Sequence, residues 1–394
     1  MKVLVISPQP VFQPRGTPLS VYYRTLVTAE LDADIDLLTY GEGADIDIRR
    51  VRIVRIPRFR VLGNVKVGPS MLKLFLDVWL FFKTVGLLLT RKYDFVHAHE
   101  EAVFFCVLLK PLFRFRYVYD MHSSLPQQLK SFEFTRSKLI IWIFEALEKK
   151  ALRSADAVIT ICQDLYDYAE PILQGRCPHV MIENSLLDPV QLITPRDESK
   201  EERVAIPLPG DHRLVVYAGT LEPYQGIELL LEAFAALATR LDDVSLVIAG
   251  GKPAQIDHYR AMAQDLDINA RCHFTGSISR AAAMHLNGQA SVLVSPRTVG
   301  GNTPLKVYEQ LASGIPLVAT DIHSHTQALN EDVAFLVRPD ADSFSDGLLR
   351  ALTSQDQARK KVKNALALYA EKYSRETYVG KMKIILEAVD GCVA

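Results

Sequence analysis

Short apolar runs alternate with longer segments of helical periodicity along the first half of the chain. The helical segments include residues 17–31 and the long stretch after Ser70. Apolar runs that end in polar residues are typical of parallel strands whose carboxyl ends open into a site. Their alternation with helices predicts a doubly wound parallel sheet. The expected strands are KVLVIS at 2–7, DIDLLTY at 34–40, VRIVRIP at 51–57, YDFVHAH at 93–99, RYVYDMH at 116–122, ADAVITICQ at 155–163 and HVMIEN at 179–184.

The pattern stops at residues 187–212 and then starts again. That segment holds four prolines and a cluster of charges, which is the composition of a linker. We therefore expect an α/β chain of two doubly wound domains, residues 1–186 and 213–375, joined by the linker 187–212. The second domain should contain helices from about Gly226 and near 255–266. Its expected strands are RLVVYAGT at 213–220, VSLVIAGG at 244–251, RCHFTGS at 271–277, ASVLVSP at 290–296, IPLVATD at 315–321 and VAFLVRP at 333–339.

Composition narrows the classes of function. The 394 residues carry a formal net charge of −1, so no general attraction to nucleic acid is expected. The five cysteines form no Cys-x-x-Cys pair, which indicates a reduced, cytoplasmic chain without a zinc site. Residues 71–90 are long enough to cross a bilayer. Because Lys73, Asp77 and Lys83 interrupt them, we expect a domain helix instead.

The segment GGNTPLKVYEQL at 300–311 has the features of an anion site at a helix start. We expect Thr303 to cap the helix and Pro304 to occupy its first position. The N–H groups of Leu305 and Lys306 would then be unpaired, and the Lys306 ammonium would add positive charge. Glu309, about one turn further, could accept hydrogen bonds from sugar hydroxyls. The alternative is an ordinary capped helix with a solvated lysine and glutamate.

A second helix start repeats this pattern. Residues 16–26 read GTPLSVYYRTL. Thr17 and Pro18 open the helix expected after the first strand, and Gly16 directly precedes them. Each domain thus presents a Thr-Pro helix start near the strand ends. Two such starts favour a diphosphate ligand, although one sequence does not separate common ancestry from coincidence.

The sequence resembles the retaining glycosyltransferases of family 4, and the resemblance covers nearly the whole chain. It rests on VYDMHSSLP, ADAVITICQDL, MIENS, VYAGTLEPYQGIELLLEAF, LVIAGG, HFTGSI and, most specifically, SPRTVGGNTPLKVYEQLASGIPLVATD. The resemblance implies the GT-B fold, two Rossmann-like domains facing a central cleft, with a C-terminal helix at about 376–394 packed back on the first domain. It also implies a nucleotide-sugar donor bound mostly by the second domain and an acceptor bound mostly by the first.

The resemblance assigns roles to individual residues. Glu309 matches the second glutamate of a Glu-x7-Glu motif and would hold the ribose, while Lys306 would contact the diphosphate. His122 looks like the active-site histidine of the acceptor domain. The three would form the catalytic set. The remaining expected donor-binding residues are Gly16, Thr17, Gly219, Thr220, Arg297, Gly300, Gly301, Asn302, Thr303, Pro304 and Leu305.

The sequence departs from the family pattern at the diphosphate. Gly301 replaces the first glutamate of the motif, and Thr220 and Gln225 stand where many relatives carry an arginine and a lysine. Two missing cations should weaken stabilisation of the leaving group, unless Lys306, Arg297 and the helix ends compensate. We expect transfer with retained configuration, without a protein nucleophile, a metal or any cofactor beyond the nucleotide sugar. The alternatives are a non-hydrolysing sugar-nucleotide epimerase and a non-catalytic binding or regulatory protein.

Several other polar residues have a functional and a structural interpretation. His97 and His99, with Glu100, could ligate a metal, but a place in the wall of the site is the better interpretation. Asp120 could orient His122 or cap a turn. Arg297 could reach phosphates or brace its loop, and the sequence does not decide between the two. His323 and His325 are best interpreted as loop histidines, and Glu222 as a solvated loop residue.

Residues 51–118 combine arginines with many apolar side chains. Such a surface could contact anionic lipid on the inner face of a membrane and meet a lipid-linked or glycan acceptor. The alternative is that the apolar residues form core and the arginines line a solvated edge.

Overall fold

The chain forms two compact units. The computed structural model describes residues 1–12, 16–59, 65, 70–126, 137–186 and 212–390. The first unit comprises Met1–Arg196 together with Arg375–Ala394, and the second comprises Asp197–Ser374. The expected linker 187–212 lies, except for residue 212, outside the described residues. Each unit is built around its own parallel sheet.

The first unit contains a seven-stranded sheet in the order β3-β2-β1-β4-β5-β6-β7, with every pairing parallel. Its interior strand β1 is buried from Val3 to Ile6 because side chains pack on both of its faces. The pattern of apolar runs therefore predicted the strands correctly. Their bounds are β1 Lys2–Ile6, β2 Asp34–Thr39, β3 Val51–Arg55, β4 Phe95–His99, β5 Arg116–Met121, β6 Ala157–Thr160 and β7 His179–Met181.

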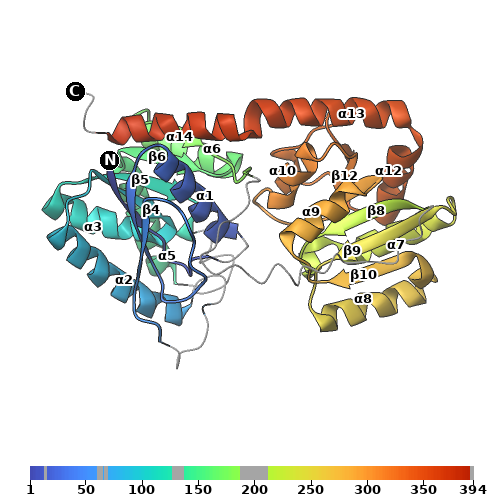
Figure 1. Ribbon diagram of the computed structural model, residues 1–394, viewed down its shortest axis with the longest axis horizontal. Helices are drawn as coiled ribbons and strands as arrows, with labels where there is room; N and C mark the ends of the chain where they lie inside the picture. The colour runs from blue at the N-terminus through green and yellow to red at the C-terminus, as the bar shows by residue number, and fades with distance from the viewer. Residues whose placement is uncertain (13–15, 60–64, 66–69, 127–136, 187–211, 391–394) are drawn as a thin grey trace. The chain divides into compact units, whose positions relative to one another are not determined.

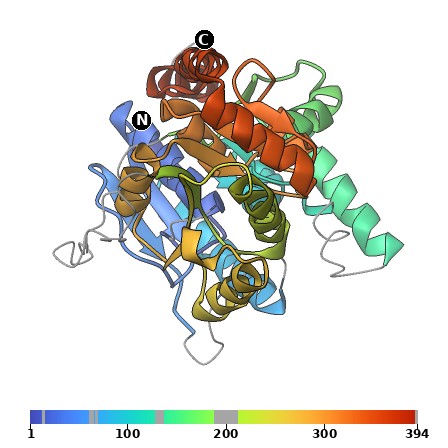
Figure 2. The same cartoon turned by 90° about the vertical axis from the view of Figure 1, so that its right-hand side faces the viewer.

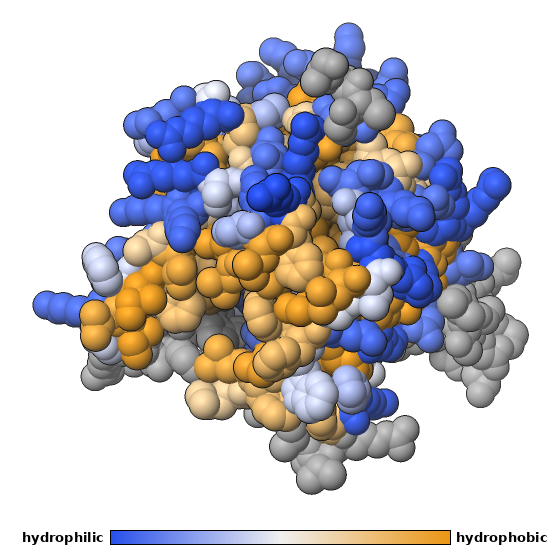
Figure 3. Space-filling model, turned by 90° about the vertical axis from the view of Figure 1, so that its left-hand side faces the viewer, coloured by the Kyte–Doolittle hydropathy of each residue, from blue (hydrophilic) through white to orange (hydrophobic). Residues whose placement is uncertain are grey.

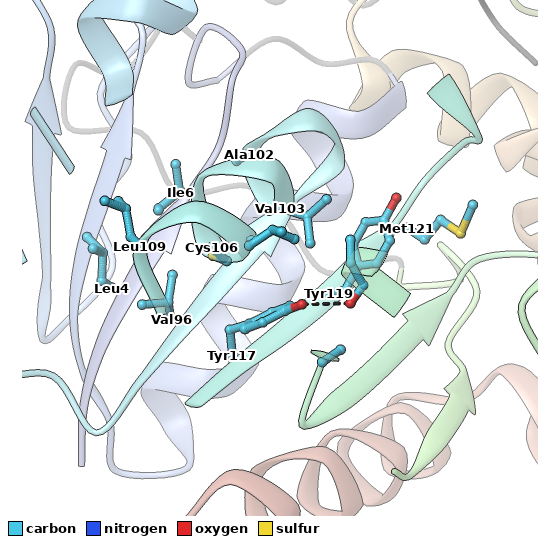
Figure 4. Close-up of a cluster of buried hydrophobic side chains, with 14 of the residues drawn as sticks. Leu4, Ile6, Val96, Ala102, Val103, Cys106, Leu109, Tyr117, Tyr119 and Met121 are labelled. Carbon is cyan, nitrogen blue, oxygen red and sulfur yellow. Dashed lines mark hydrogen bonds between the residues drawn. The ribbon is translucent and has the colours of Figure 1, made fainter. Parts of the chain in front are cut away.

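Helices cover both faces of this sheet (Figure 1). One face packs against α2 (Met71–Thr90), α3 (Val103–Phe113), α5 (Lys138–Ser154) and α6 (Gln163–Leu173). Figure 4 shows α3 laying Val103, Cys106 and Leu109 against Leu4 of β1 and Val96 of β4. The opposite face packs against α1 (Gly16–Glu30) and α14 (Arg375–Val389), so the end of the chain completes the core of the first unit.

The second unit contains a six-stranded parallel sheet in the order β10-β9-β8-β11-β12-β13. The strands are β8 Arg213–Ala218, β9 Val244–Ala249, β10 Cys272–Gly276, β11 Val292–Ser295, β12 Leu317–Thr320 and β13 Phe335–Val337. One face packs against α7, α8 and α12, and the other against α9, α10 and α13 (Figure 2). These helices are α7 Ile227–Ala238, α8 Pro253–Asp265, α9 Arg280–Gly288, α10 Leu305–Ala312, α11 His323–Thr326, α12 Ala341–Thr353 and α13 Gln355–Leu368.

The apolar segment after Ser70 folds as the expected domain helix. The Ser70 hydroxyl accepts a hydrogen bond from the Lys73 N–H at 3.2 Å and so caps α2. Asp77 points toward the first sheet, where the Tyr40 hydroxyl donates to its carboxylate. Among the described helices, none combines the length and apolar character needed to cross a membrane.

Candidate active site

The helix start predicted from GGNTPLK lies in the second unit, after the carboxyl end of β11. The helix α10 begins at Leu305, and Pro304 is its N-cap residue, with extended backbone angles of φ −63° and ψ 134°. The prediction that Thr303 caps the helix and Pro304 fills its first position was therefore wrong by one residue. No side chain makes a capping hydrogen bond at this end. The first amides of α10, including those of Leu305 and Lys306, are consequently left to a ligand or to water.

The Lys306 side chain lies beneath this helix start. Its Nζ sits 4.1 Å from the centre of the Tyr217 ring and 3.5 Å from Gln225 Oε1. Burial, with a smaller effect of the neighbouring Arg297 charge, lowers the pKa of Lys306 to about 7. A partly desolvated ammonium next to free amides is a strong site for an anion, because binding would restore the charge interactions that burial removed.

Arg297 braces the loop that precedes α10. Its Nε donates to the Val299 carbonyl at 2.8 Å and its Nη1 to the Asn302 carbonyl at 3.1 Å. Gly300 is required here, because its φ is +149° and a Cβ would lie 2.2 Å from Arg297 Nη2. Of the two interpretations of Arg297, the geometry favours the loop brace. By contrast, a Cβ on Gly301 would meet no atom within 4 Å.

Glu309 lies one turn into α10 and forms an ion pair that the sequence did not indicate. Arg280, at the start of α9, donates to Glu309 Oε1 from Nη2 at 2.8 Å and from Nε at 3.1 Å. Both side chains remain partly exposed. The Ser279 hydroxyl caps α9 and so fixes the helix that carries Arg280. The predicted role of Glu309 toward a ribose stays a prediction.

The turn after β8 adds two of the expected donor-binding residues, Gly219 and Thr220. The turn approaches Gly250 closely, because a Cβ on Gly250 would lie 1.8 Å from the Gly219 carbonyl oxygen. The Tyr217 hydroxyl donates to the Thr220 carbonyl at 2.6 Å. Gln225 Nε2 reaches Thr220 Oγ1 at 3.4 Å. Neutral side chains, those of Thr220 and Gln225, thus occupy the two positions where many relatives carry an arginine and a lysine.

Histidine 325 is a buried structural residue. It lies in the short helix α11, so the interpretation of it and His323 as loop residues was wrong. Its ring nitrogens contact Ser295 Oγ at 2.8 Å and the Thr320 carbonyl at 2.9 Å. Burial lowers the pKa of His325 to about 4, so the ring is neutral at pH 7. It ties the ends of β11 and β12 together beneath the α10 loop.

In the first unit, the strand ends gather a buried polar network around Asp120. His122 follows β5 and is 3% exposed, and its Nε2 lies 3.2 Å from Asp120 Oδ1 and 3.0 Å from His99 Nδ1. His97 Nε2 contacts Asp120 Oδ2 at 3.1 Å. Burial lowers the pKa of His122 to about 4 and lowers that of His99. His99 and His122 are therefore neutral at pH 7. Asp120 orients His122, as one of its two interpretations stated.

Arg24 compensates the buried charge of Asp120. The guanidinium Nε donates to Asp120 Oδ2 at 3.0 Å, and neither side chain is exposed. Arg24 also donates to the Ile182 carbonyl at 2.6 Å and to the Tyr378 hydroxyl of α14. Although burial alone would raise it, the pKa of Asp120 is held well below its usual range by Arg24 and the adjacent histidines. Sequence inspection missed both Arg24 and Tyr378, because neither belongs to a local motif.

His97, His99 and Asp120 are close enough together to hold a metal ion. The third member differs from the expected Glu100, whose carboxylate instead accepts from Thr17 Oγ1 at 3.1 Å. Arg24 already supplies a positive charge to Asp120, so a cation there would meet electrostatic repulsion. We interpret the group as a structural network, in agreement with the wall position favoured for the two histidines.

The start of α1 borders a second buried polar cluster. Gly16 is exposed with a φ of +47°, and Thr17 contacts Glu100, which itself has a left-handed φ of +48°. Burial, and next the neighbouring Glu101 charge, raise the pKa of Glu100 to about 7. Lys73 pairs with Glu101 at 3.1 Å. Gly16 and Thr17 thus lie at the carboxyl edge of the first sheet, where they were expected.

Comparison with known families identifies the class. A model described as "Glycosyl transferase 4-like domain" matches residues 23–183, and one described as "Glycosyl transferases group 1" matches residues 198–367. The chain belongs to this glycosyltransferase family. The expected resemblance to family 4 is thereby confirmed.

Two curated relatives illustrate the range of the family. An uncharacterized glycosyltransferase of Methanocaldococcus jannaschii is 24% identical over 352 residues, which cover 86% of each chain. A phosphatidyl-myo-inositol mannosyltransferase of Mycobacterium tuberculosis is 27% identical over 190 residues, covering 46% of this chain and 49% of that protein.

Solved structures with the same architecture confirm the GT-B fold. Sucrose-phosphate synthase of Thermosynechococcus elongatus superposes with a TM-score of 0.72 at 18% identity, covering 98% of each chain. HepE of Anabaena, solved with UDP, gives a TM-score of 0.69 at 16% identity, covering 98% of this chain and all of that one. At such low identity the likeness shows the fold alone.

Proposed function

We propose that this protein transfers a sugar from a nucleotide-diphosphate sugar to a hydroxyl acceptor, with retention of configuration. The observation that carries the proposal is the start of α10, where uncapped amides lie beside Lys306. Membership of the glycosyltransferase family supports it. So does the fold shared with HepE, whose structures hold UDP or UDP-glucose.

The proposed reaction breaks the bond between the anomeric carbon and the diphosphate oxygen. Negative charge then builds on the diphosphate, and the amides of Leu305 and Lys306, together with the Lys306 ammonium, stabilise it. Glu309 accepts hydrogen bonds from the ribose hydroxyls. The acceptor hydroxyl attacks the anomeric carbon from the face that the diphosphate leaves, and its proton passes to the leaving oxygen. The step uses no protein nucleophile and no metal.

We assign His122 a neutral role in this reaction. Because its pKa is lowered to about 4, the ring carries no charge at pH 7 and serves as a hydrogen-bond partner for a sugar hydroxyl. Asp120 fixes the plane of the ring. A charged imidazolium would instead be expected to hold the departing phosphate.

The proposed acceptor is a glycan or a lipid-linked molecule. One relative, which this chain matches over 49% of the relative's length, is named a phosphatidyl-myo-inositol mannosyltransferase. This name supports a lipid acceptor. The proposed place of action is the cytoplasm, with peripheral contact to the inner face of a membrane.

The test combines donor binding with donor hydrolysis. A thermal-shift screen of UDP-, GDP- and ADP-sugars identifies the donor, because a ligand that binds the folded state raises Tm. Hydrolysis of that donor is then measured for Lys306→Ala and Glu309→Ala, with Lys360→Ala on the exposed side of α13 as the control. We expect the Lys306 change to lower kcat by about 100-fold, as for loss of a transition-state charge partner, and the control to match the unaltered protein.

Three other results would redirect the assignment. Unchanged turnover in both site variants would refute the transferase site. Release of a nucleotide sugar in which one stereocentre of the sugar has been inverted would indicate the epimerase. Tight binding without turnover would indicate the non-catalytic alternative that Thr220 and Gln225 raise.

A further inference from the structure

The outward faces of α2, α3 and α5 are apolar, contrary to what is normal for helices that cover a sheet. Of the 18 large hydrophobic side chains exposed among the described residues, 13 lie on these three helices. The helices pack side by side, with ring contacts joining Phe81 of α2 to Phe105 of α3 and Phe104 of α3 to Phe144 of α5. Figure 3 looks onto this apolar face, where the orange side chains form a broad field with blue ones at its border.

These helices do not need their outward residues for the core. In α2 the buried residues are Leu76, Leu80, Thr84 and Leu87, which form one stripe facing the sheet. Phe82, in contrast, is 65% exposed. A covering helix normally carries polar residues on its solvent side. A large exposed apolar patch with a polar border marks a surface that binds something.

Two observations identify a lipid surface as the occupant. The chain has only two tryptophans, and both lie on the apolar face, with Trp79 42% and Trp142 63% exposed. Tryptophan is enriched at membrane interfaces, because its ring is apolar and its N–H bonds to water or headgroups. Clustering both of them here, on two different helices, is what an interfacial surface requires.

The charge around the apolar face is complementary to anionic lipid. Lys83, Lys138, Lys149 and Lys150 are exposed on α2 and α5 and form no ion pair with any described residue. Two acidic residues of these helices have partners in the interior, since Asp77 contacts Tyr40 and Glu148 contacts Ser124, and the third, Glu145, is half-buried. Two copies meeting through this face would oppose these lysines to one another, which disfavours self-association.

We propose that the apolar face of α2, α3 and α5 docks onto a membrane surface that contains anionic lipids, with Trp79 and Trp142 at the headgroup level. The sequence placed a membrane contact in residues 51–118, which include α2 and α3. The proposed face keeps these two helices but leaves out β3. Strand β3 with its arginines forms ion pairs at the sheet edge, Arg52 with Asp36 and Arg55 with Asp45. The N-terminal part of α5, outside that range, is part of the face. The proposal concerns binding and is independent of the chemistry of the transfer site.

The experiment uses the full chain with vesicles of phosphatidylcholine, with or without phosphatidylglycerol. Flotation measures binding, and tryptophan emission reports on the face directly, since no tryptophan lies elsewhere. We expect flotation with the phosphatidylglycerol vesicles, a shift of emission to shorter wavelength, and weaker binding at high salt. Chains with Trp79→Phe or Trp142→Phe should each retain the shift. No flotation and no shift on anionic vesicles would overturn the proposal.

Paired variants distinguish binding through this face from nonspecific hydrophobic adsorption to the vesicles. Phe82→Glu with Leu112→Glu should weaken the vesicle affinity by at least about tenfold, because two exposed apolar anchors become charged. Ile384→Glu changes an apolar residue that is 50% exposed on α14 in the same unit. It is the control and should bind as the unaltered chain does. Equal loss in both would overturn the assignment of the face.

The lysines are tested in the same way. Lys149→Glu with Lys150→Glu should weaken binding to anionic vesicles, by about fivefold or more per residue, while Lys360→Glu with Lys363→Glu on α13 should not. Retained circular dichroism and a retained thermal shift with UDP show that each variant folds. A dimer abolished by the Phe82 and Leu112 changes, without flotation of the unaltered chain, would assign the face to a second copy and overturn the lipid proposal.

Discussion

At the scale of single residues, Lys306 is set apart by its surroundings. It lies against the Tyr217 ring, and its pKa is lowered to about 7, so near neutral pH the side chain is only partly charged before a ligand binds. An arginine at this position would stay charged throughout the physiological range. The lysine should therefore make the proposed diphosphate binding sensitive to pH.

We expect the affinity for UDP to fall as the pH rises above 7. Only the protonated Lys306 attracts the diphosphate, so Kd should increase by up to about tenfold per pH unit between pH 7 and pH 9. Isothermal titration calorimetry across that range measures it. Lys306→Arg serves as the comparison and should give a flatter curve. An identical slope in both proteins would show that Lys306 is not the titrating group.

The same shift has a consequence for stability of the opposite sign. The folded pKa of about 7 lies below the unfolded value, so the unfolded chain binds more protons between the two pKa values. The contribution of Lys306 to the free energy of unfolding therefore becomes more favourable as the pH rises through this window. Ligand binding and stability thus depend on its protonation in opposite directions.

The Arg24–Asp120 pair is the second feature at this scale. Because both side chains are fully buried, removing one partner leaves an uncompensated charge. Asp120→Asn or Arg24→Met alone should lower the free energy of unfolding by about 3–5 kcal/mol. The double variant Arg24→Met with Asp120→Asn should lose less than the sum of the two single changes. Urea unfolding of the four proteins measures the coupling, and simple additivity would contradict a direct interaction.

At the scale of elements, two helix glycines make a matched pair. Gly86 lies inside α2 with open space where a Cβ would go, whereas a Cβ on Gly347 of α12 would lie 2.8 Å from Val337 Cγ1. Gly86→Ala should raise the free energy of unfolding by about 0.5–1 kcal/mol, because alanine favours the helix. Gly347→Ala should lower it. Thermal unfolding shows the sign of each change, and stabilisation by both would mean that α12 can shift away from β13.

The elements differ in how far sequence could specify them. Parallel strands such as β1 are buried on both faces, so they appear in the sequence as continuous apolar runs, which are easily recognised. The short helix α11 has four residues and no periodic pattern, and it was not expected. At α10, a Thr-Pro pair is compatible with a helix that begins at either residue. The extended ψ of Pro304 decided between them.

The candidate site was predictable only where its residues are neighbours along the chain. The loop from Gly300 to Lys306 and the glutamate one turn later form a local pattern. Arg24 and Tyr378, in contrast, are 354 positions apart, and no spacing rule brings them together. Arg280 was missed for the same reason, since its partner Glu309 lies 29 residues further along the chain. Long-range ion pairs follow from the topology of the sheet and not from any motif.

At the scale of the whole molecule, α14 makes the end of the chain part of the first unit. Tyr378, Met382, Ile385, Leu386 and Val389 are buried in the core that α14 shares with α1. Each buried side chain of this size contributes about 1.5–3 kcal/mol. Their sum rivals the entire stability of a typical domain, about 5–15 kcal/mol.

A chain ending at Ser374 should therefore lose the first unit and keep the second. Amide hydrogen exchange should show β1, β4 and β5 unprotected, while β8 and β9 retain their protection. Met382→Ala in the full chain is the milder comparison and should cost about 2–5 kcal/mol. Equal protection of both sheets in the shortened chain would show that the first unit folds without α14.

The position of α14 also bears on how the polypeptide matures as it leaves the ribosome. Translation delivers the strands of the first sheet early, but the part of that sheet that α14 covers stays exposed until residues 375–389 have been synthesised. The second unit, lying wholly between the two parts of the first, can finish folding before then. While the second unit is being synthesised, the first unit would thus stay incomplete, with the hydrophobic strip that α14 covers exposed to chaperones or to premature aggregation.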